Sequence, residues 1–257
     1  MRRPWALLLA LGGCQGALPP LRGQLESGKD GYVVFVGGTG QAGGDLYAVP
    51  VGGGAALPLT WSAVGEMRPA LSPDGAAVAF LRGGSLRDST PGTAWVMNLL
   101  SGAERQLLLP KAAGMPGRVG WGEGGRALVV RAGDGLYRFP VPPTSERGVP
   151  VAGAARPVAE SALAVWLGEP AFARAVPCAG EDVCVVADTG PPALLARGVR
   201  DPARWGADSV AYVAGSTILV RPLGPGRERR LLMSGAPPAP RQITVFTGAS
   251  GPAPAPP

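Results

Sequence analysis

The sequence contains no histidine, which excludes several kinds of active site at once. A Ser-His-Asp triad, a Cys-His pair and a histidine-based zinc site all need an imidazole. Lysine is nearly absent too, so scattered arginines carry most of the positive charge of a chain whose net charge is +6. The one dense group, Arg227, Arg229 and Arg230, fits the solvent-exposed edge of a strand. Because a nucleic-acid surface needs clustered basic residues or interleaved aromatic residues, we expect no nucleic-acid partner.

Only three cysteines are present, and the first follows an apolar run at the N-terminus. The segment MRRPWALLLALGGCQG has two arginines, an apolar run from Trp5 to Leu11, and then Leu-Gly-Gly-Cys. Such a run is too short to span a bilayer as a helix. It resembles the lipobox of bacterial lipoprotein signal peptides, which implies cleavage after residue 13 and lipidation of Cys14. A plain secretory signal that happens to contain a cysteine is the alternative.

The resemblance to lipoproteins predicts where the protein resides. Residues 1–13 would be the signal peptide, and residues 14–30, which are poor in apolar side chains, a flexible tether to the lipid bilayer. The protein would then be lipid-anchored in the bacterial cell envelope and face the periplasm. The residue after the expected lipidated cysteine is Gln15 and not an aspartate, which favours the outer membrane in a cell with two membranes.

The two remaining cysteines, Cys178 and Cys184, lie in the segment AVPCAGEDVCVVAD. Two strand-like runs flank Ala-Gly-Glu-Asp, so the pair is expected across the base of a hairpin, where facing Cβ atoms come near disulfide distance. An exported protein would oxidise them. Two free core cysteines are the alternative, and a metal site lacks further ligands of the Cys or His type.

Aromatic residues make up only 6% of the chain, whereas glycine (41) and proline (29) together exceed a quarter of it. They fall between short apolar runs, so they punctuate strands rather than mark disorder. Four units share a bulky anchor, a polar turn and an apolar run: LSPDGAAVAF from Leu71, WGEGGRALVV from Trp121, WLGEPAFARA from Trp166 and WGADSVAYV from Trp205. An aromatic strand and a leucine-rich strand follow each. The anchors Leu71, Trp121, Trp166 and Trp205 lie 50, 45 and 39 residues apart. Four-stranded units repeating at such intervals predict a β-propeller.

The two ends of this region predict how the propeller closes. GYVVFVGG from Gly31 is a second-position strand with no anchor strand before it, and RQITVFTG from Arg241 is an extra strand with nothing after it. If RQITVFTG completes the sheet begun by GYVVFVGG, the propeller spans residues 31–248 and closes with five four-stranded blades. This pairing would cover a strand edge that is otherwise exposed. Residues 249–257, ASGPAPAPP, are expected to be a disordered tail.

One unit resembles a known family closely enough to name it. SPDGAAVAFLR, followed by a Trp-containing strand and a leucine strand, resembles the TolB-like β-propeller repeat. The matching residues are Ser72, Pro73, Asp74, Gly75, Val78, Ala79 and Phe80. The other units are degenerate. The resemblance implies a binding platform, because the peptidases that carry such propellers add a separate catalytic domain, for which this chain has no room.

Carboxylates recur in the turns after the anchor strands, at Asp74, Glu123, Glu169 and Asp208. Turn formation explains them best, with a cation site or catalysis as alternatives. The expected inner strands (PALS, RVGW, ALAVW, PARW and QITVF) contain no carboxylate, which argues against a channel enzyme. GGTGQAGG, from Gly37 to Gly44, contains G-x-G-x-x-G but no helix pattern follows, so it is interpreted as a loop. We expect no cofactor and no metal.

These observations favour a non-catalytic, membrane-anchored propeller that binds an envelope protein or a peptidoglycan-associated partner. The longest loops are expected on one face and carry Arg68, Arg82, Arg87 and Arg118, which suit carboxylate or phosphate groups. A small carbohydrate-active hydrolase or lyase working in the channel is the alternative function.

Overall fold

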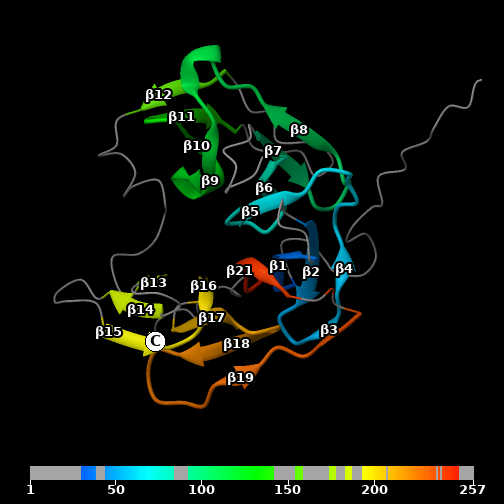
Figure 1. The fold of residues 1–257 in the computed structure, drawn as a ribbon, viewed down its shortest axis with the longest axis vertical. Helices are drawn as coiled ribbons and strands as arrows, with labels where there is room; N and C mark the ends of the chain where they lie inside the picture. Colours follow the sequence, from blue (N-terminus) through cyan, green and yellow to red (C-terminus); the bar gives the residue numbers. More distant parts are fainter. Residues whose placement is uncertain are drawn as a thin grey trace, which may run out of the picture.

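The computed structural model describes residues 30–38, 44–83, 92–141, 154–158, 174–177, 183–186, 193–206, 208–235, 237 and 239–248. Nearly all of them lie in short antiparallel strands or in the turns that join them (Figure 1). The only helical elements in these ranges are two single 3-10 turns, η1 (Lys111–Ala113) and η2 (Glu123–Gly125). A helix able to cross a bilayer is therefore not found in the described part of the chain.

The described residues form five sheets with three or four strands each. The first sheet has the order β21 (Arg241–Phe246), β1 (Tyr32–Gly37), β2 (Asp45–Pro50) and β4 (Leu57–Pro58). The second is β5 (Glu66–Leu71), β6 (Ala77–Arg82), β7 (Thr93–Asn98) and β8 (Glu104–Leu107). The third is β9 (Pro116–Gly122), β10 (Ala127–Ala132), β11 (Gly135–Pro140) and β12 (Arg156–Val158).

The remaining strands complete the set. The fourth sheet is β13 (Arg174–Pro177), β14 (Val183–Val186) and β15 (Ala193–Ala196). The fifth is β16 (Arg200–Trp205), β17 (Ser209–Ala214), β18 (Thr217–Pro222) and β19 (Arg229–Arg230). A short parallel pair joins β3 (Gly54–Ala55) to β20 (Met233–Ser234).

The innermost strands of successive sheets lie side by side, β16 against β21, β21 against β5, and β5 against β9. Figure 1 shows the sheets following one another around a common centre, with β21 (red) beside β1 (blue). The fold is therefore an all-β propeller, as the sequence predicts. The total number of blades stays a prediction, since residues 159–173, between the third and fourth sheets, are not among those described.

The predicted closure of the first sheet is confirmed. β21 pairs antiparallel with β1, with Tyr32 opposite Phe246, so one sheet is built from both ends of the propeller sequence. β1 reads YVVFVG and every residue in it is buried, as expected for a strand covered on both faces. The Tyr32 hydroxyl donates a hydrogen bond to the Gly75 carbonyl of the second sheet, and its ring centroid lies 5.7 Å from that of Phe246.

Apolar layers between neighbouring sheets hold the blades together. One layer joins the first and second sheets, another the second and third, and another the first and fifth. Trp121, an anchor residue of the repeat, packs in the layer between the second and third sheets, and its indole Nε1 donates to the Ala70 carbonyl at 2.8 Å. Trp121 thus packs between two blades, whereas Trp166, the anchor of another unit, lies outside the described residues.

The fourth sheet contains Cys184, one of the two cysteines predicted to be paired. β13 and β14 form the expected antiparallel hairpin, but their register places Cys184 opposite Val176. The two cysteines were expected to face each other directly, and for Cys184 this expectation is not met. Cys178 lies outside the described residues, as does the expected anchor strand of this blade, ALAVW, so the disulfide stays a prediction.

The Ser72–Gly75 motif forms the predicted turn between β5 and β6. The Asp74 carboxylate accepts from the Ala76 amide at 3.0 Å, the Ser72 hydroxyl oxygen accepts from the Ala77 amide at 2.9 Å, and Gly75 has a φ of 67°. Glu123 likewise lies in a turn, where it pairs with Arg138 at 2.6 Å. These carboxylates therefore serve turns and sheet edges, while Glu169 lies outside the described residues.

Candidate functional site

One end of the propeller gathers the starts of its innermost strands. β5, β9, β16 and β21 begin there, and the second strands of their sheets end there, because Glu66 lies opposite Arg82 and Arg241 opposite Val36. We call this the arginine end. The other end, the turn end, carries the Ser72–Gly75 turn and the Tyr32–Phe246 pair. The arginine end is the face that the sequence predicts to bind.

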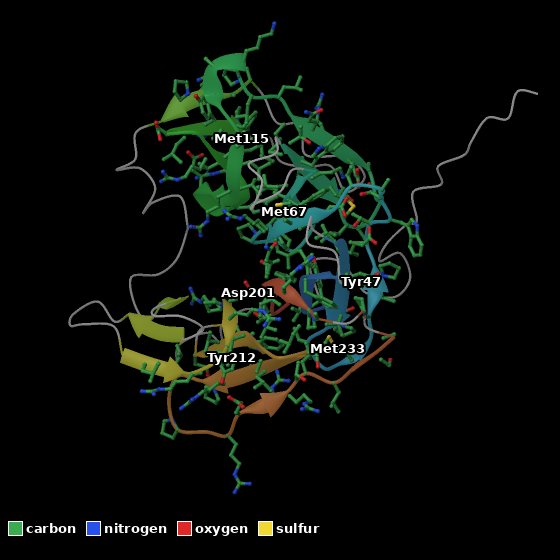
Figure 2. The ribbon with its side chains drawn as sticks, viewed as in Figure 1. Tyr47, Met67, Met115, Asp201, Tyr212 and Met233 are labelled. Carbon is green, nitrogen blue, oxygen red and sulfur yellow. The ribbon has the colours of Figure 1, made fainter. Side chains whose placement is uncertain are left out.

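Three innermost strands carry the same unusual backbone feature near the arginine end. Arg68 in β5, Asp201 in β16 and Gln242 in β21 have φ values of 53°, 53° and 51°, and at each of them the pairing with the next strand shifts register. Residues with a side chain rarely adopt this left-handed conformation, which costs about 1–2 kcal/mol. Asp201, labelled in Figure 2, lies toward the middle of the molecule. Such bulges redirect side chains, so the three residues form one structural set.

In β9 the corresponding position is a glycine. The register of β9 with β10 shifts around Gly117, and a Cβ built on this residue would meet nothing within 4 Å. The Arg68 guanidinium extends toward this position and donates from NH1 to the Gly117 carbonyl. The arginine of the second sheet thus binds the backbone of β9 at its register shift.

Arg68 connects three sheets through hydrogen bonds. Its amide donates to the Gln242 Oε1 of β21 at 2.6 Å, while its guanidinium contacts Gly117 of β9. Burial, and then the positive charge of nearby Arg118, lower the pKa of Arg68 below its ordinary value. No acidic side chain among the described residues pairs with either arginine. The Arg68 guanidinium therefore lies at the residue next to Arg118, and the structure describes no acidic side chain that neutralises either charge.

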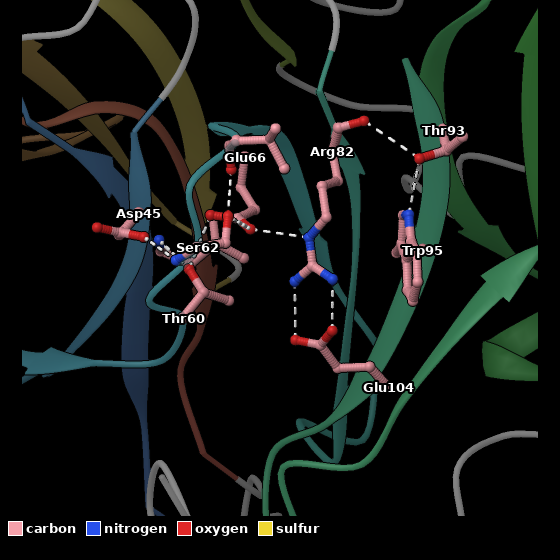
Figure 3. Close-up of polar contacts among 10 residues, drawn as sticks. Asp45, Thr60, Ser62, Glu66, Arg82, Thr93, Trp95 and Glu104 are labelled. Carbon is pink, nitrogen blue, oxygen red and sulfur yellow. Dashed lines mark hydrogen bonds and ion pairs between the residues drawn. The ribbon is translucent and has the colours of Figure 1, made fainter. Parts of the chain in front are cut away.

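A buried ionic network supports the start of β5, two residues before Arg68 (Figure 3). The Glu66 side chain is fully buried and accepts hydrogen bonds from the Thr60 hydroxyl, the Ser62 hydroxyl and Arg82 Nε, each at 2.9 Å. Burial raises the pKa of Glu66, and these three hydrogen bonds oppose that shift. The loop between β4 and β5 is thereby tied to the strand that carries Arg68.

Arg82 lies within the second sheet. Its guanidinium stacks over the rings of Phe80 and Trp95, at 5.1 and 4.7 Å from their centroids, and binds both oxygens of Glu104 at 2.5 and 2.9 Å. Together with the hydrogen bond to Glu66, these contacts give the charge of Arg82 partners within the protein. Arg82 is therefore occupied by structural contacts.

The structure brings together two of the four arginines predicted for the binding face. Arg68 and Arg118 are neighbours at the arginine end, Arg82 belongs to the ionic network, and Arg87 lies outside the described residues. Two carboxylates in innermost strands were missed, because β5 and β16 begin earlier than expected and so include Glu66 and Asp201. The dipeptide Pro-Ala follows both Arg68 and Asp201, which was a signal that β5 and β16 share one register and that Asp201 corresponds to Arg68.

The chemistry available at this end is the binding of anions. Guanidinium groups bind carboxylates and phosphates in a bidentate manner. The described residues contain no group of three or more side chains able to hold a metal ion. Gly37 is the last residue of β1 and Gly44 directly precedes β2, so the GGTGQAGG sequence joins the two strands of an antiparallel hairpin, which agrees with the loop interpretation.

No protein-family model matches the chain, and no curated protein sequence matches it. Solved structures resemble its fold. TolB from Acinetobacter baumannii is 13% identical over 84% of this chain and 66% of its own, with a TM-score of 0.42. A TolB from Agrobacterium tumefaciens is 14% identical over 84% of this chain and 74% of its own, with a TM-score of 0.34.

A periplasmic gluconolactonase from Pseudomonas aeruginosa is 17% identical over 78% of this chain and 67% of its own, with a TM-score of 0.32. The chain thus spans just under two thirds of the Acinetobacter TolB. The likeness concerns the fold alone.

Proposed function

We propose that this protein is a non-catalytic binding module of the cell envelope, which holds an anionic group of an envelope protein or peptidoglycan-associated partner at its arginine end. The observation that carries this proposal is that the Arg68 guanidinium reaches the carbonyl of Gly117, the residue before Arg118, and that neither arginine pairs with an acidic side chain among the described residues. A carboxylate or phosphate placed between them would relieve their repulsion and gain charge-assisted hydrogen bonds.

The fixed position of Arg68 supports a binding role. Its backbone is held in a left-handed conformation, its amide is bonded to Gln242, and its guanidinium to Gly117. A side chain already ordered in the free protein loses little conformational entropy when a ligand arrives. Strained residues of this kind persist where the surrounding structure fixes them, and they cluster at ligand-binding positions.

The carboxylates of the innermost strands support the non-catalytic part of the proposal. A glycosidase needs two carboxyl groups flanking the bond that is cleaved. Glu66 is fully buried and accepts three hydrogen bonds, and the Asp201 carboxylate lies 3.7 Å from Arg200 Nε. Both carboxylates therefore interact with nearby residues of the protein.

Binding of an anion can be measured directly with a fluorescent hexaglutamate peptide. We expect the Arg68→Ala/Arg118→Ala variant to bind it at least tenfold more weakly than the wild type, because each charged hydrogen bond contributes about 1.5–3 kcal/mol. The matched control is Arg126→Ala/Arg156→Ala, which removes two exposed arginines away from this end. Capture from detergent-solubilised membranes with the same three proteins then identifies the partner. Equal peptide affinity for all three would refute the site.

The location in the envelope rests on Cys14. Cys14→Ser should release the protein from membranes or leave the precursor unprocessed, since anchoring depends on the attached acyl chains. Normal processing with full membrane retention would contradict the anchor. An exported protein should also contain a disulfide between Cys178 and Cys184, which would leave neither thiol open to alkylation before reduction.

A further inference from the structure

Positive charge is concentrated on the fifth sheet, far from the arginine pair in sequence. Between residues 193 and 235 the chain has three acidic residues, Asp201, Asp208 and Glu228, and seven arginines: Arg197, Arg200, Arg204, Arg221, Arg227, Arg229 and Arg230. Residues 44–83, by contrast, contain two arginines and three acidic residues. In residues 193–235 the seven arginines outnumber the three acidic residues by four, which is a large part of the net charge of +6.

The densest part of this charge lies at the outer edge, around β19. Arg227, Arg229 and Arg230 are all exposed. β19 pairs only with β18 in its sheet, so its other side faces outward. In Figure 1 it lies on the outer rim of the fold, away from β5 and β9. We call this region, together with Leu232, the outer edge.

The charges of the outer edge are not neutralised within the protein. The acidic residue among them, Glu228, accepts a hydrogen bond from the Tyr212 hydroxyl. Arg229 lies over the Trp205 ring, 4.8 Å from its centroid, a contact that leaves its charge in place. No ion pair forms at Arg227 or Arg230 in the part of the chain that the structure describes.

An exposed apolar side chain stands beside these arginines. Leu232 is 70% exposed, while its neighbour Leu231 is 2% exposed and belongs to the core. A leucine projecting next to clustered arginines is the combination that binds membrane surfaces, because the charges attract anionic headgroups and the apolar group enters the acyl boundary.

We infer that the outer edge docks on an anionic phospholipid surface. Charge complementarity selects this occupant, and the length of the chain before the propeller permits it. From Cys14 to Asp30 the chain can reach at most about 55 Å, whereas a domain of this size has a radius of gyration of about 17 Å. An anchored propeller can therefore lay this edge on the bilayer and leave its innermost strands for a partner.

Vesicle binding tests the inference independently of the partner site. Full-length protein with Cys14→Ser, which carries no acyl chain, is sedimented with vesicles of phosphatidylglycerol and phosphatidylcholine, and with vesicles of phosphatidylcholine alone. We expect tighter binding to the anionic vesicles, and loss of this preference at high salt. Arg227→Gln/Arg229→Gln/Arg230→Gln in the same background should bind the anionic vesicles about a hundredfold more weakly, since each arginine contributes about fivefold.

The matched control is Arg105→Gln/Arg126→Gln/Arg156→Gln, which removes the same charge from exposed positions of other sheets. It should lose much less affinity than the outer-edge variant. Arg227→Gln/Arg230→Gln keeps the Arg229 contact with Trp205 and separates lost charge from altered packing. An equal loss of affinity in the two triple variants would mean that binding depends only on the net charge of the protein, and this would overturn the inference. So would equal binding of the wild-type edge to neutral and anionic vesicles.

Discussion

The two ends of the propeller are built from different interactions. At the turn end, the first and second sheets meet through neutral groups: the Tyr32 hydroxyl donates to the Gly75 carbonyl, and the Phe246 ring lies against Gly75. The ion pair of this end, Glu123 with Arg138, lies within the third sheet. At the arginine end, charge dominates, with Glu66 and Arg82 in a buried network and Arg68 beside Arg118. In the proposed function, recognition belongs to the charged end, whereas the neutral contacts of the turn end serve the packing of the first two sheets.

The largest effect is expected from removing the buried carboxylate of the arginine end. Glu66→Ala leaves Thr60, Ser62 and Arg82 without their shared acceptor, and we expect it to lower the free energy of unfolding by about 3 kcal/mol. Urea unfolding at neutral pH measures it. The matched control, Glu104→Ala, removes a partly exposed partner of the same arginine and should cost about 1 kcal/mol. Equal costs would mean that Glu66 is no more important than a surface ion pair.

Two glycines test the neutral packing of the turn end. Gly75 and Gly83 have nearly equal φ values, 67° and 69°, but a Cβ on Gly75 would lie 2.5 Å from the Phe246 ring, whereas nothing lies within 4 Å of one on Gly83. Gly83→Ala should therefore cost only about 1 kcal/mol of backbone strain, and Gly75→Ala about 3 kcal/mol, because β21 must also shift. Thermal melts compare them. Similar melting temperatures would show that Phe246 does not pack on this turn.

The raised pKa of Glu66 predicts a dependence on pH. A carboxyl group whose pKa is higher in the folded than in the unfolded protein stabilises the fold most below its ordinary value of about 4.5, and this contribution falls as the pH rises through the raised pKa. The difference in unfolding free energy between wild type and Glu66→Gln should therefore decrease from pH 4 toward neutral pH. A difference that grows with pH would mean that the hydrogen bonds from Arg82, Thr60 and Ser62 outweigh burial.

Much of the fold could be predicted from the sequence, because strand alternation and turn chemistry are local signals. The Ser72–Gly75 turn, the antiparallel sheets and the pairing of β21 with β1 all follow from patterns of a few residues. The closure also followed from counting strands, since a sheet with an unpaired edge needed a partner and one unassigned strand remained.

The site was less accessible to sequence reasoning for a physical reason. The left-handed conformations of Arg68, Asp201 and Gln242 arise where strand pairing shifts by tertiary fit, and no local propensity predicts them for these residue types. The pairing of Arg82 with Glu104 joins positions 22 residues apart, which the spacing alone does not reveal. Both features depend on how the strands align.

The smallest effect on stability is expected from Arg118→Ala, and its sign sharpens the contrast between the two ends. Arg118 is exposed, makes no ion pair among the described residues, and disfavours the charge of Arg68. Removing it should change the free energy of unfolding by no more than about 0.5 kcal/mol. The change should be stabilising at low salt and vanish at high salt, because salt screens repulsion between exposed charges. Arg126→Ala, at the turn end, loses a hydrogen bond to the Glu123 carbonyl and should be slightly destabilising at any salt concentration. Destabilisation by Arg118→Ala at low salt would show that this arginine supports the fold, and the arginine end would then lack the unpaired charge that distinguishes it from the turn end.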